Sequence, residues 1–332
     1  MRKFSLLLFL MLCAVLPAIA EFDDMEDMDY WYEQLCILSD EIGCRPVGSE
    51  GEVAAMNHIR NVFEELGFRA EDSTLNEYAV ETALGTDLEA VIPAAGSDNP
   101  AIIIVGAHYD SAPPKPVVGG EILDVPGTRD NASGLSAMLA FAREFAAMPP
   151  FPDTELRFVA FTAEETGHQG SMAYVDSLTQ DERNRTIAMF NLDLITVDVW
   201  LENHVFSCDT MGMRTENGYV DGTGNAPAVN KVARAVLAAM EELAYFDPAD
   251  NGYTHCVPRN YGLSDHDAFH FAGVDSANLC FRGNTEEGGH WHPYMHKPDD
   301  GVGDLDLSRT YEALHIVYTA IHNLALDASY GD

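Results

Sequence analysis

The sequence has few basic residues. Only 18 of its 332 residues are Lys or Arg, against 54 Asp and Glu, and the formal net charge is −36 at pH 7. The cations are scattered and form no basic stripe, which excludes nucleic acid and anionic membrane surfaces as expected partners. The acidity itself is typical of a soluble protein outside the cell and indicates no particular activity.

Long apolar runs are missing beyond the N-terminus, so no later segment is expected to cross a membrane. At the start, two cations precede an apolar stretch over residues 4–16, and Ala18-Ile19-Ala20 is a small-residue cleavage site. We therefore expect residues 1–20 to be a signal peptide that is cleaved near Ala20, with secretion to the extracellular space or the periplasm. Leu12 precedes Cys13, where a lipoprotein would carry a small residue, so no stable membrane anchor is expected.

Cysteine is scarce, and its spacing makes a structural zinc site of the Cys-x-x-Cys kind improbable. Five cysteines follow the predicted signal peptide: Cys36, Cys44, Cys208, Cys256 and Cys280. An odd number leaves at least one thiol free or paired between chains. Cys36 with Cys44 is the plainest disulfide candidate, and five reduced, packed thiols are the alternative.

Repeats, low-complexity tracts and linkers are absent, so residues 21–332 are predicted to form a single domain. Helical spacing of apolar residues predicts helices over residues 25–40, 50–66, 133–148, 226–243 and 308–326. Apolar runs predict strands over residues 69–80, 88–93, 101–106, 155–161, 187–194 and 274–281. Strands that alternate with helices favour an α/β fold with a mainly parallel sheet and helices on both faces.

Side chains that bind metals occur near the ends of several of these strands. The series is His108-Tyr109-Asp110, Asp130-Asn131-Ala132-Ser133-Gly134, Glu164-Glu165, Asp193 and His296. Open α/β sheets place their ligands beyond the carboxyl ends of strands, so we expect these side chains to lie close together. Imidazoles, a bridging carboxylate and one spare carboxylate as base are what a two-metal hydrolytic site needs.

These motifs, together with Ser264-Asp265-His266 and His296-Lys297-Pro298-Asp299-Asp300, resemble the secreted bacterial leucyl aminopeptidases of peptidase family M28. The resemblance extends from about Ile42 to the last predicted helix. It implies a mixed sheet of about eight strands sandwiched by helices. It also implies a zinc-dependent hydrolase with two Zn²⁺ per chain that acts on peptides with a free N-terminus. Glutaminyl cyclases, which use one zinc, and carboxypeptidases share the fold and are alternatives.

The resemblance implies metal-binding roles for five side chains. Asp130 would bridge both ions through its two oxygens. His108 and Asp193 would complete the ligands of one ion, and Glu165 and His296 those of the other.

The resemblance also implies that Glu164 is the general base and that a hydroxide between the two zinc ions is the nucleophile. The order within the Glu164-Glu165 pair rests on the family motif alone. His290 and His292 are rivals to His296 in the same loop, and His296 is preferred because it alone leads into Lys-Pro-Asp-Asp.

Four neighbours are expected to support the ligands without binding metal: Asp110, Asn131, Asp265 and His266. Asp110 lies two residues after His108, so on an extended strand both side chains point the same way. The Asp110 carboxylate can then accept the second ring N–H of the imidazole. The resemblance further implies a non-proline cis peptide between Asp130 and Asn131.

Two cations flank the predicted site. Arg129 precedes Asp130, where many relatives carry an acid or a small residue, and it is expected to alter the local charge. Arg282 follows the last core strand, and a surface ion pair is favoured over substrate recognition as its role. The substrate pocket is expected from loops around residues 194–199, 256–263 and 281–291, whose irregularity leaves the preferred N-terminal residue undetermined. The oligomeric state, the physiological metal and any calcium site are also undetermined.

Overall fold

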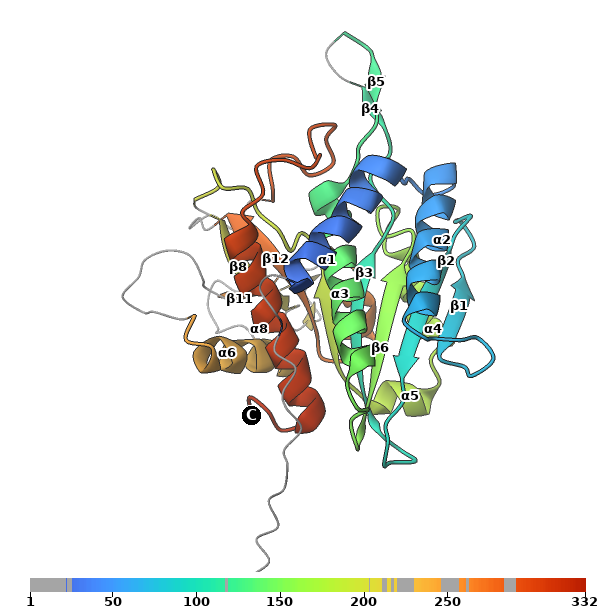
Figure 1. Cartoon of the computed structure of the whole chain (residues 1–332), viewed down its shortest axis with the longest axis vertical. Helices are drawn as coiled ribbons and strands as arrows, with labels where there is room; N and C mark the ends of the chain where they lie inside the picture. The colour runs from blue at the N-terminus through green and yellow to red at the C-terminus, as the bar shows by residue number, and fades with distance from the viewer. Residues whose placement is uncertain are drawn as a thin grey trace, which may run out of the picture.

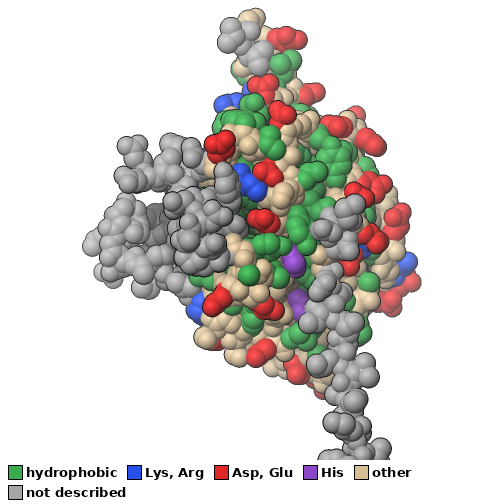
Figure 2. Space-filling view, turned by 60° about the vertical axis from the view of Figure 1, so that its left-hand side comes forward, with side chains coloured by type: hydrophobic (Ala, Val, Ile, Leu, Met, Phe, Trp, Pro, Cys, Tyr) green, Lys and Arg blue, Asp and Glu red, His purple; other side chains and the backbone are tan. Residues whose placement is uncertain are grey.

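The computed structural model describes Phe22 and residues 26–116, 119–202, 204–210, 214–215, 218–219, 230–245, 257–260, 263–283 and 291–332. Residues 1–20 lie outside this set, so the signal peptide stays a prediction. Within the described part of the chain, no helix combines the length and the apolar character needed to cross a membrane. Figure 2 shows Asp and Glu side chains spread over one face of the molecule, with few Lys or Arg among them.

The fold is built on an eight-stranded mixed sheet (Figure 1). In spatial order its strands are β1 (Leu75–Ala79), β2 (Thr86–Ile92), β6 (Thr154–Phe161), β3 (Ala101–His108), β7 (Thr186–Leu192), β12 (Ser276–Gly283), β8 (His204–Thr210) and β11 (Val257–Asn260). The four central strands β6, β3, β7 and β12 are mutually parallel, whereas β1, β2 and β8 each pair antiparallel with a neighbour. The predicted mixed, mainly parallel α/β sheet is confirmed.

Helices cover both faces of this sheet (Figure 1). One face carries α1 (Glu26–Cys36), α2 (Glu50–Glu65), α3 (Ser133–Ala147), α6 (Lys231–Glu242) and α8 (Leu307–Leu326), and the other carries α4 (Gln169–Ser177) and α7 (His266–Phe271). Along β3, Ile103 and Val105 join the first core while Ile102 and Ile104 join the second. Successive side chains of a strand point to opposite faces, so burial on both faces explains the uninterrupted apolar run.

Several predicted elements have different ends in the structure. The strand predicted over residues 69–80 begins only at Leu75, because the Ser73 N–H bonds to the Ala70 carbonyl in a preceding turn. The strand predicted over residues 187–194 ends at Leu192, which leaves Asp193 in the following loop. Helix α1 continues beyond Cys36 as a π-helical turn, η1 (Ile37–Ile42).

Other elements had no clear pattern in the sequence. The strands β8 and β11 and the helices α4, α5 (Gln180–Arg185) and α7 belong to this group. The loop over residues 111–129 contains a short antiparallel pair, β4 (Lys115–Pro116) with β5 (Ile122–Leu123), which projects from the body in Figure 1. A second short pair joins β9 (Arg214–Thr215) to β10 (Gly218–Tyr219). The strands of these two short pairs have two residues each, which is too few for a recognisable period.

The candidate disulfide does not form. Cys36, Cys44, Cys208 and Cys280 form no disulfide among the described residues, and Cys256 lies outside them. Cys36 ends α1, and the segment that follows it is the helical turn η1 rather than a hairpin loop that would fold Cys44 back. Packed, reduced thiols are therefore the alternative that the structure supports.

Candidate metal centre

Most residues of the predicted site lie at the ends of the central strands or in the loops that follow them. His108 ends β3, Glu164 and Glu165 lie shortly after β6, and Asp193 directly follows β7. Asp130 lies in the turn η2 (Thr128–Ala132) that precedes α3. Because β6, β3 and β7 are adjacent and parallel, their carboxyl ends bring these loops to one edge of the sheet.

The ligand atoms converge as two groups, His108 with Glu164 and Asp193, and Asp130 with Glu165 and His296. Within each group the atoms lie within 4.8 Å of one another. Asp130 links the groups, because its Oδ1 lies 3.3 Å from His108 Nε2 and its Oδ2 lies 3.0 Å from His296 Nε2. The two oxygens of one carboxylate thus face two imidazoles. The expected cis peptide between Asp130 and Asn131 is confirmed.

The remaining distances complete the two groups. His108 Nε2 lies 3.6 Å from Asp193 Oδ1 and 4.0 Å from Glu164 Oε2. His296 Nε2 lies 3.0 Å from Glu165 Oε2. The His108 side chain is almost fully buried whereas that of His296 is 36% exposed, so the site opens to solvent on the His296 side.

Buried atoms of the site fit a bound cation. His108 Nε2, Asp193 Oδ1 and Glu165 Oε1 are buried without a hydrogen-bond partner among the described residues. An unpaired buried polar atom is costly, and a metal ion would supply the missing partner. The donors are imidazole nitrogens and carboxylate oxygens, which zinc prefers. Four carboxylates meet at the site, and their charge matches that of two divalent cations.

The same crowding of charges shifts the pKa values of the site. Hydrogen bonds to Asp130 and Glu165 raise the pKa of His296 to about 10. Burial opposes protonation of His108, yet the charge of Glu164 and the other carboxylates raises its pKa well above the ordinary value. Burial and the charge of Asp130 raise the pKa of Glu165 to about 7. Protons therefore compete with a metal ion for these ligands.

Asp110 contacts both the expected imidazole and the loop that carries the two glutamates. His108 Nδ1 lies 3.2 Å from the Asp110 backbone carbonyl oxygen and 3.4 Å from its Oδ1. The Asp110 carboxylate also accepts hydrogen bonds from the backbone N–H groups of Glu164 and Glu165, each at 3.1 Å. One side chain thus fixes the loop that carries both glutamates relative to the strand that carries His108.

Asn131 performs a similar role for the Asp193 loop. Its Nδ2 donates to the Leu192 carbonyl at 2.8 Å, and its Oδ1 accepts from the N–H of Leu194 at 3.3 Å. The same Oδ1 accepts from the Gly134 N–H at 3.0 Å at the start of α3. The amide therefore holds the residues on both sides of Asp193 against the helix that follows Asp130.

Asp265 and His266 are buried but belong to neither ligand group of the described residues. Burial raises the pKa of Asp265 to about 6. His266 Nε2 lies 3.5 Å from Asp267 Oδ1. Their neighbour Ser264 makes a direct contact that sequence reasoning missed, because its hydroxyl donates to Asp193 Oδ2 at 2.8 Å. Ser264 lies within the motif that carried the resemblance, which is the signal that could have identified it.

The two flanking arginines are buried, and the surface ion pair predicted for Arg282 is wrong. Arg282 is 1% exposed, its Nε lies 2.5 Å from Asp209 Oδ2, and its guanidinium carbon lies 3.4 Å from the centre of the Trp291 ring. Both Arg282 and Asp209 are on strands inside the sheet, which explains their burial. Arg129 is also 1% exposed and pairs with two buried aspartates.

A cavity of roughly 150 Å³ opens at the metal centre. Its lining residues are Asp130, Glu164, Asp193, Leu194, Leu263, Trp291, Met295 and His296. Three of the four apolar members fall in or at the ends of the loops expected to form the substrate pocket, and Met295 adds a fourth. His292, a predicted rival of His296, lies away from the ligands with Nε2 3.4 Å from Asp198 Oδ2, while His290 lies outside the described residues.

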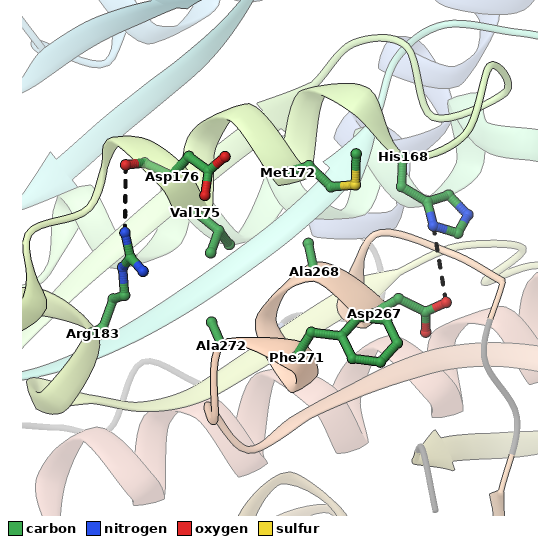
Figure 3. Close-up of a pocket in the computed structure, with 9 residues that line it drawn as sticks. All are labelled: His168, Met172, Val175, Asp176, Arg183, Asp267, Ala268, Phe271 and Ala272. Carbon is green, nitrogen blue, oxygen red and sulfur yellow. Dashed lines mark hydrogen bonds and ion pairs between the residues drawn. The ribbon is translucent and has the colours of Figure 1, made fainter. Parts of the chain in front are cut away.

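A second cavity of roughly 350 Å³ lies between α4 and α7 (Figure 3). Met172 and Val175 from α4 face Ala268 and Phe271 from α7 across it. His168 stands between the two cavities, with Nε2 3.4 Å from Glu164 Oε1 and Nδ1 3.9 Å from Asp267 Oδ2. His168 is thus a further contact of Glu164 that the sequence did not indicate.

Comparison with known proteins agrees with this geometry. The model of peptidase family M28 matches residues 90–321. The chain belongs to this family. Aminopeptidase YwaD of Bacillus subtilis (strain 168) is 33% identical over 225 residues, which cover 68% of this chain and 41% of the relative. The chain spans less than half the length of the first curated relatives that it matches.

Solved structures share the fold. BSAP, a zinc aminopeptidase from Bacillus subtilis, superposes with a TM-score of 0.68 at 20% identity and covers 89% of this chain and 94% of its own. A glutaminyl cyclase of Tannerella forsythia superposes with a TM-score of 0.67 at 17% identity, covering 92% of this chain and 99% of its own. The fold is therefore common to both kinds of enzyme, and the site has to distinguish them.

Proposed function

We propose that this chain is a co-catalytic di-zinc aminopeptidase that removes single residues from the N-terminus of peptides. The observation that carries the proposal is the Asp130 carboxylate, whose two oxygens face His108 and His296. Asp193 would complete the ligands of the ion at His108, and Glu165 those of the ion at His296. Membership of family M28 and the aminopeptidase names of similar proteins support it.

Glu164 is the residue that would move the proton. Bound zinc would supply a Lewis acid that polarises the scissile carbonyl and lowers the pKa of water. The backbone N–H of Glu164 donates to the Asp110 carboxylate, and the Glu164 Oε1 lies 3.4 Å from His168 Nε2. Burial raises the pKa of Glu164, which suits its carboxylate to accept a proton from water and pass it to the leaving amine.

The charge of the cavity favours a substrate with a free amino group. Asp193 and Glu164 line it and would pair with the N-terminal ammonium. The described residues that line this cavity include no Lys or Arg that would bind a C-terminal carboxylate, which disfavours a carboxypeptidase. The side chain of the N-terminal residue would rest on the apolar part of the wall, made of Leu194, Leu263, Trp291 and Met295.

A glutaminyl cyclase is the second candidate, because the glutaminyl cyclase of Tannerella forsythia shares the fold. The observation against it is the second complete ligand group, Asp130 with Glu165 and His296, which a one-zinc enzyme does not need.

The test combines metal binding with three substrates. Zinc titration of the metal-free full chain should give two ions per chain, and a chelator should abolish turnover until zinc is restored. A free dipeptide amide should be cleaved and its N-acetylated form should not. Release of pyroglutamate from a peptide with an N-terminal Gln would favour the cyclase, and equal cleavage of both dipeptides would contradict an aminopeptidase.

A further inference from the structure

The proposed ligand His296 lies on a segment without regular structure. The described residues 291–306 contain no helix or strand, and His296 itself has a φ of 57°, in the left-handed region. A non-glycine residue in that region is held there by its surroundings. The position of His296 therefore depends on what this segment binds elsewhere in the molecule.

The main side chain that binds this segment is Arg129. Its Nη1 donates to Asp300 Oδ1 at 3.2 Å and to the Gly301 carbonyl at 2.8 Å. Its Nη2 donates to the Gly303 carbonyl at 2.8 Å and to Asp198 Oδ1, and its Nε donates to the same Oδ1 at 3.0 Å. All five N–H bonds of the buried guanidinium thus have an acceptor. Three of the five go to residues 300–303.

Asp300 connects the same segment to the backbone of the proposed bridging ligand. Its Oδ1 accepts from the Arg129 N–H at 2.9 Å, and its Oδ2 accepts from the Asp130 N–H at 3.3 Å. The Asp300 carbonyl accepts from the Thr128 N–H at 3.2 Å. Asp300 lies four residues after His296. Its carboxylate therefore connects the segment that carries His296 to the backbone of Asp130, and these are two of the ligands proposed for the second ion.

Asp198 adds a third segment to the cluster. It lies in the loop after Asp193, is fully buried, and has Oδ2 3.4 Å from His292 Nε2. The guanidinium of Arg129 also lies over the Tyr294 ring, 5.5 Å from its centre. Breaking one member of a buried ionic cluster leaves an uncompensated charge, so the three segments are held together strongly.

We propose that Arg129, Asp198 and Asp300 form a buried clamp that positions His296 against Asp130 and so builds the second zinc site. The clamp residues are positioning residues, because they act on the metal through Asp130 and His296. The role of the clamp in zinc binding rests on the proposed function, whereas its contacts with residues 291–306 do not depend on that function. Loss of an outer partner of a metal ligand typically weakens metal affinity about 10–100-fold.

The first measurement is hydrogen exchange in the metal-free full chain. Asp300→Asn removes one charge with little change of shape, and Arg129→Met removes the guanidinium. Arg157→Met is the matched control, because Arg157 is a buried arginine on β6 whose ion-pair partners are not predicted ligands. Amides of residues 291–306 should exchange about tenfold faster in Asp300→Asn and Arg129→Met than in the wild type. In Arg157→Met their exchange should equal that of the wild type. Unchanged exchange in a folded Asp300→Asn would overturn the clamp.

The second measurement is zinc affinity by competition with a chromogenic chelator. Asp300→Asn should bind one zinc ion as tightly as the wild type and the other with about 10–100-fold lower affinity. His296→Ala should lower the affinity for the same ion. The control Arg157→Met should bind as the wild type does. Equal affinity of Asp300→Asn and wild type for both ions would refute the metal-positioning role. A wild-type chain that binds fewer than two ions would instead refute the proposed function, and the exchange data would still test the clamp.

Discussion

Arg45 should be the arginine on which the stability of this fold depends most. Its side chain is fully buried, and burial lowers its pKa to about 10, which still leaves it charged at pH 7. In the described part of the chain its acceptors are all backbone carbonyls, those of Leu38, Gly43, Tyr109, Pro126 and Gly127. It therefore ties the N-terminal segment to the strand end that carries His108 and to the turn before Asp130.

The cost of Arg45→Met follows from these contacts. Three of the bonds are buried, those to the carbonyls of Leu38, Tyr109 and Gly127, and water cannot easily replace the donor there. An unsatisfied buried carbonyl costs about 1–3 kcal/mol, so the free energy of unfolding should fall by about 3–9 kcal/mol. The free energy of unfolding of a typical domain is about 5–15 kcal/mol in total, so this loss should leave the variant close to unfolded.

The assay is urea unfolding of the metal-free chain, so that zinc affinity does not contribute. Arg60→Met is the control, because Arg60 forms an ion pair with Glu77 at the surface. An exposed pair of this kind contributes at most about 1 kcal/mol. Arg45→Lys should lie between Arg45→Met and wild type, since an ammonium keeps the charge but not the fork of donors. A loss below about 1 kcal/mol for Arg45→Met would refute the reasoning.

Further predictions concern the glutamates. Glu164→Gln should bind two zinc ions and lose about 10²–10⁴-fold in turnover. Glu165→Gln should instead bind one of the two ions with lower affinity. Equal metal content in both variants would contradict their separate roles. Burial and the carboxylate of Asp27 raise the pKa of Glu144 to about 7, against roughly 4.3 in an unfolded chain. The folded state then holds more protons between these values, so stability falls as pH rises through that window. Glu144→Gln should therefore raise the melting temperature at pH 8 but not at pH 4, while Glu33→Gln at an exposed position should change neither.

Much of the fold and the site could be predicted from local sequence. The apolar run that becomes β3 and the helical spacing of α3 and α8 are properties of short segments, which is why both were found with only small errors at their ends. His108 and Glu165 could be found because each follows a predicted strand, and Asp193 because it lies near the end of one. Asp130 and His296 could be found because they lie in motifs that carry the resemblance.

The supporting residues could not be predicted, because their roles depend on contacts between distant parts of the chain. Asp300 lies 170 residues from Asp130, yet its carboxylate accepts the Asp130 N–H. Arg282 has no sequence feature that distinguishes a buried pair with Asp209 from a surface one. A charged residue that becomes buried has the same sequence signature as one that stays exposed, because its burial depends on the sheet and on the loops that cover it.

The sequence by itself determined the class of fold, the order of strands and helices along the chain and the inventory of metal-binding side chains. The resemblance implied how the ligands divide between two ions, and only the tertiary structure decided whether their atoms meet. It places β6 beside β3 and β3 beside β7, so that the two oxygens of Asp130 meet imidazoles from residues 108 and 296. The physical reason is that periodicity reports the burial of each segment against an unspecified core, whereas a ligand sphere needs particular atoms within a few ångströms. Only the pairing of strands and the buried clamps between loops fix those positions.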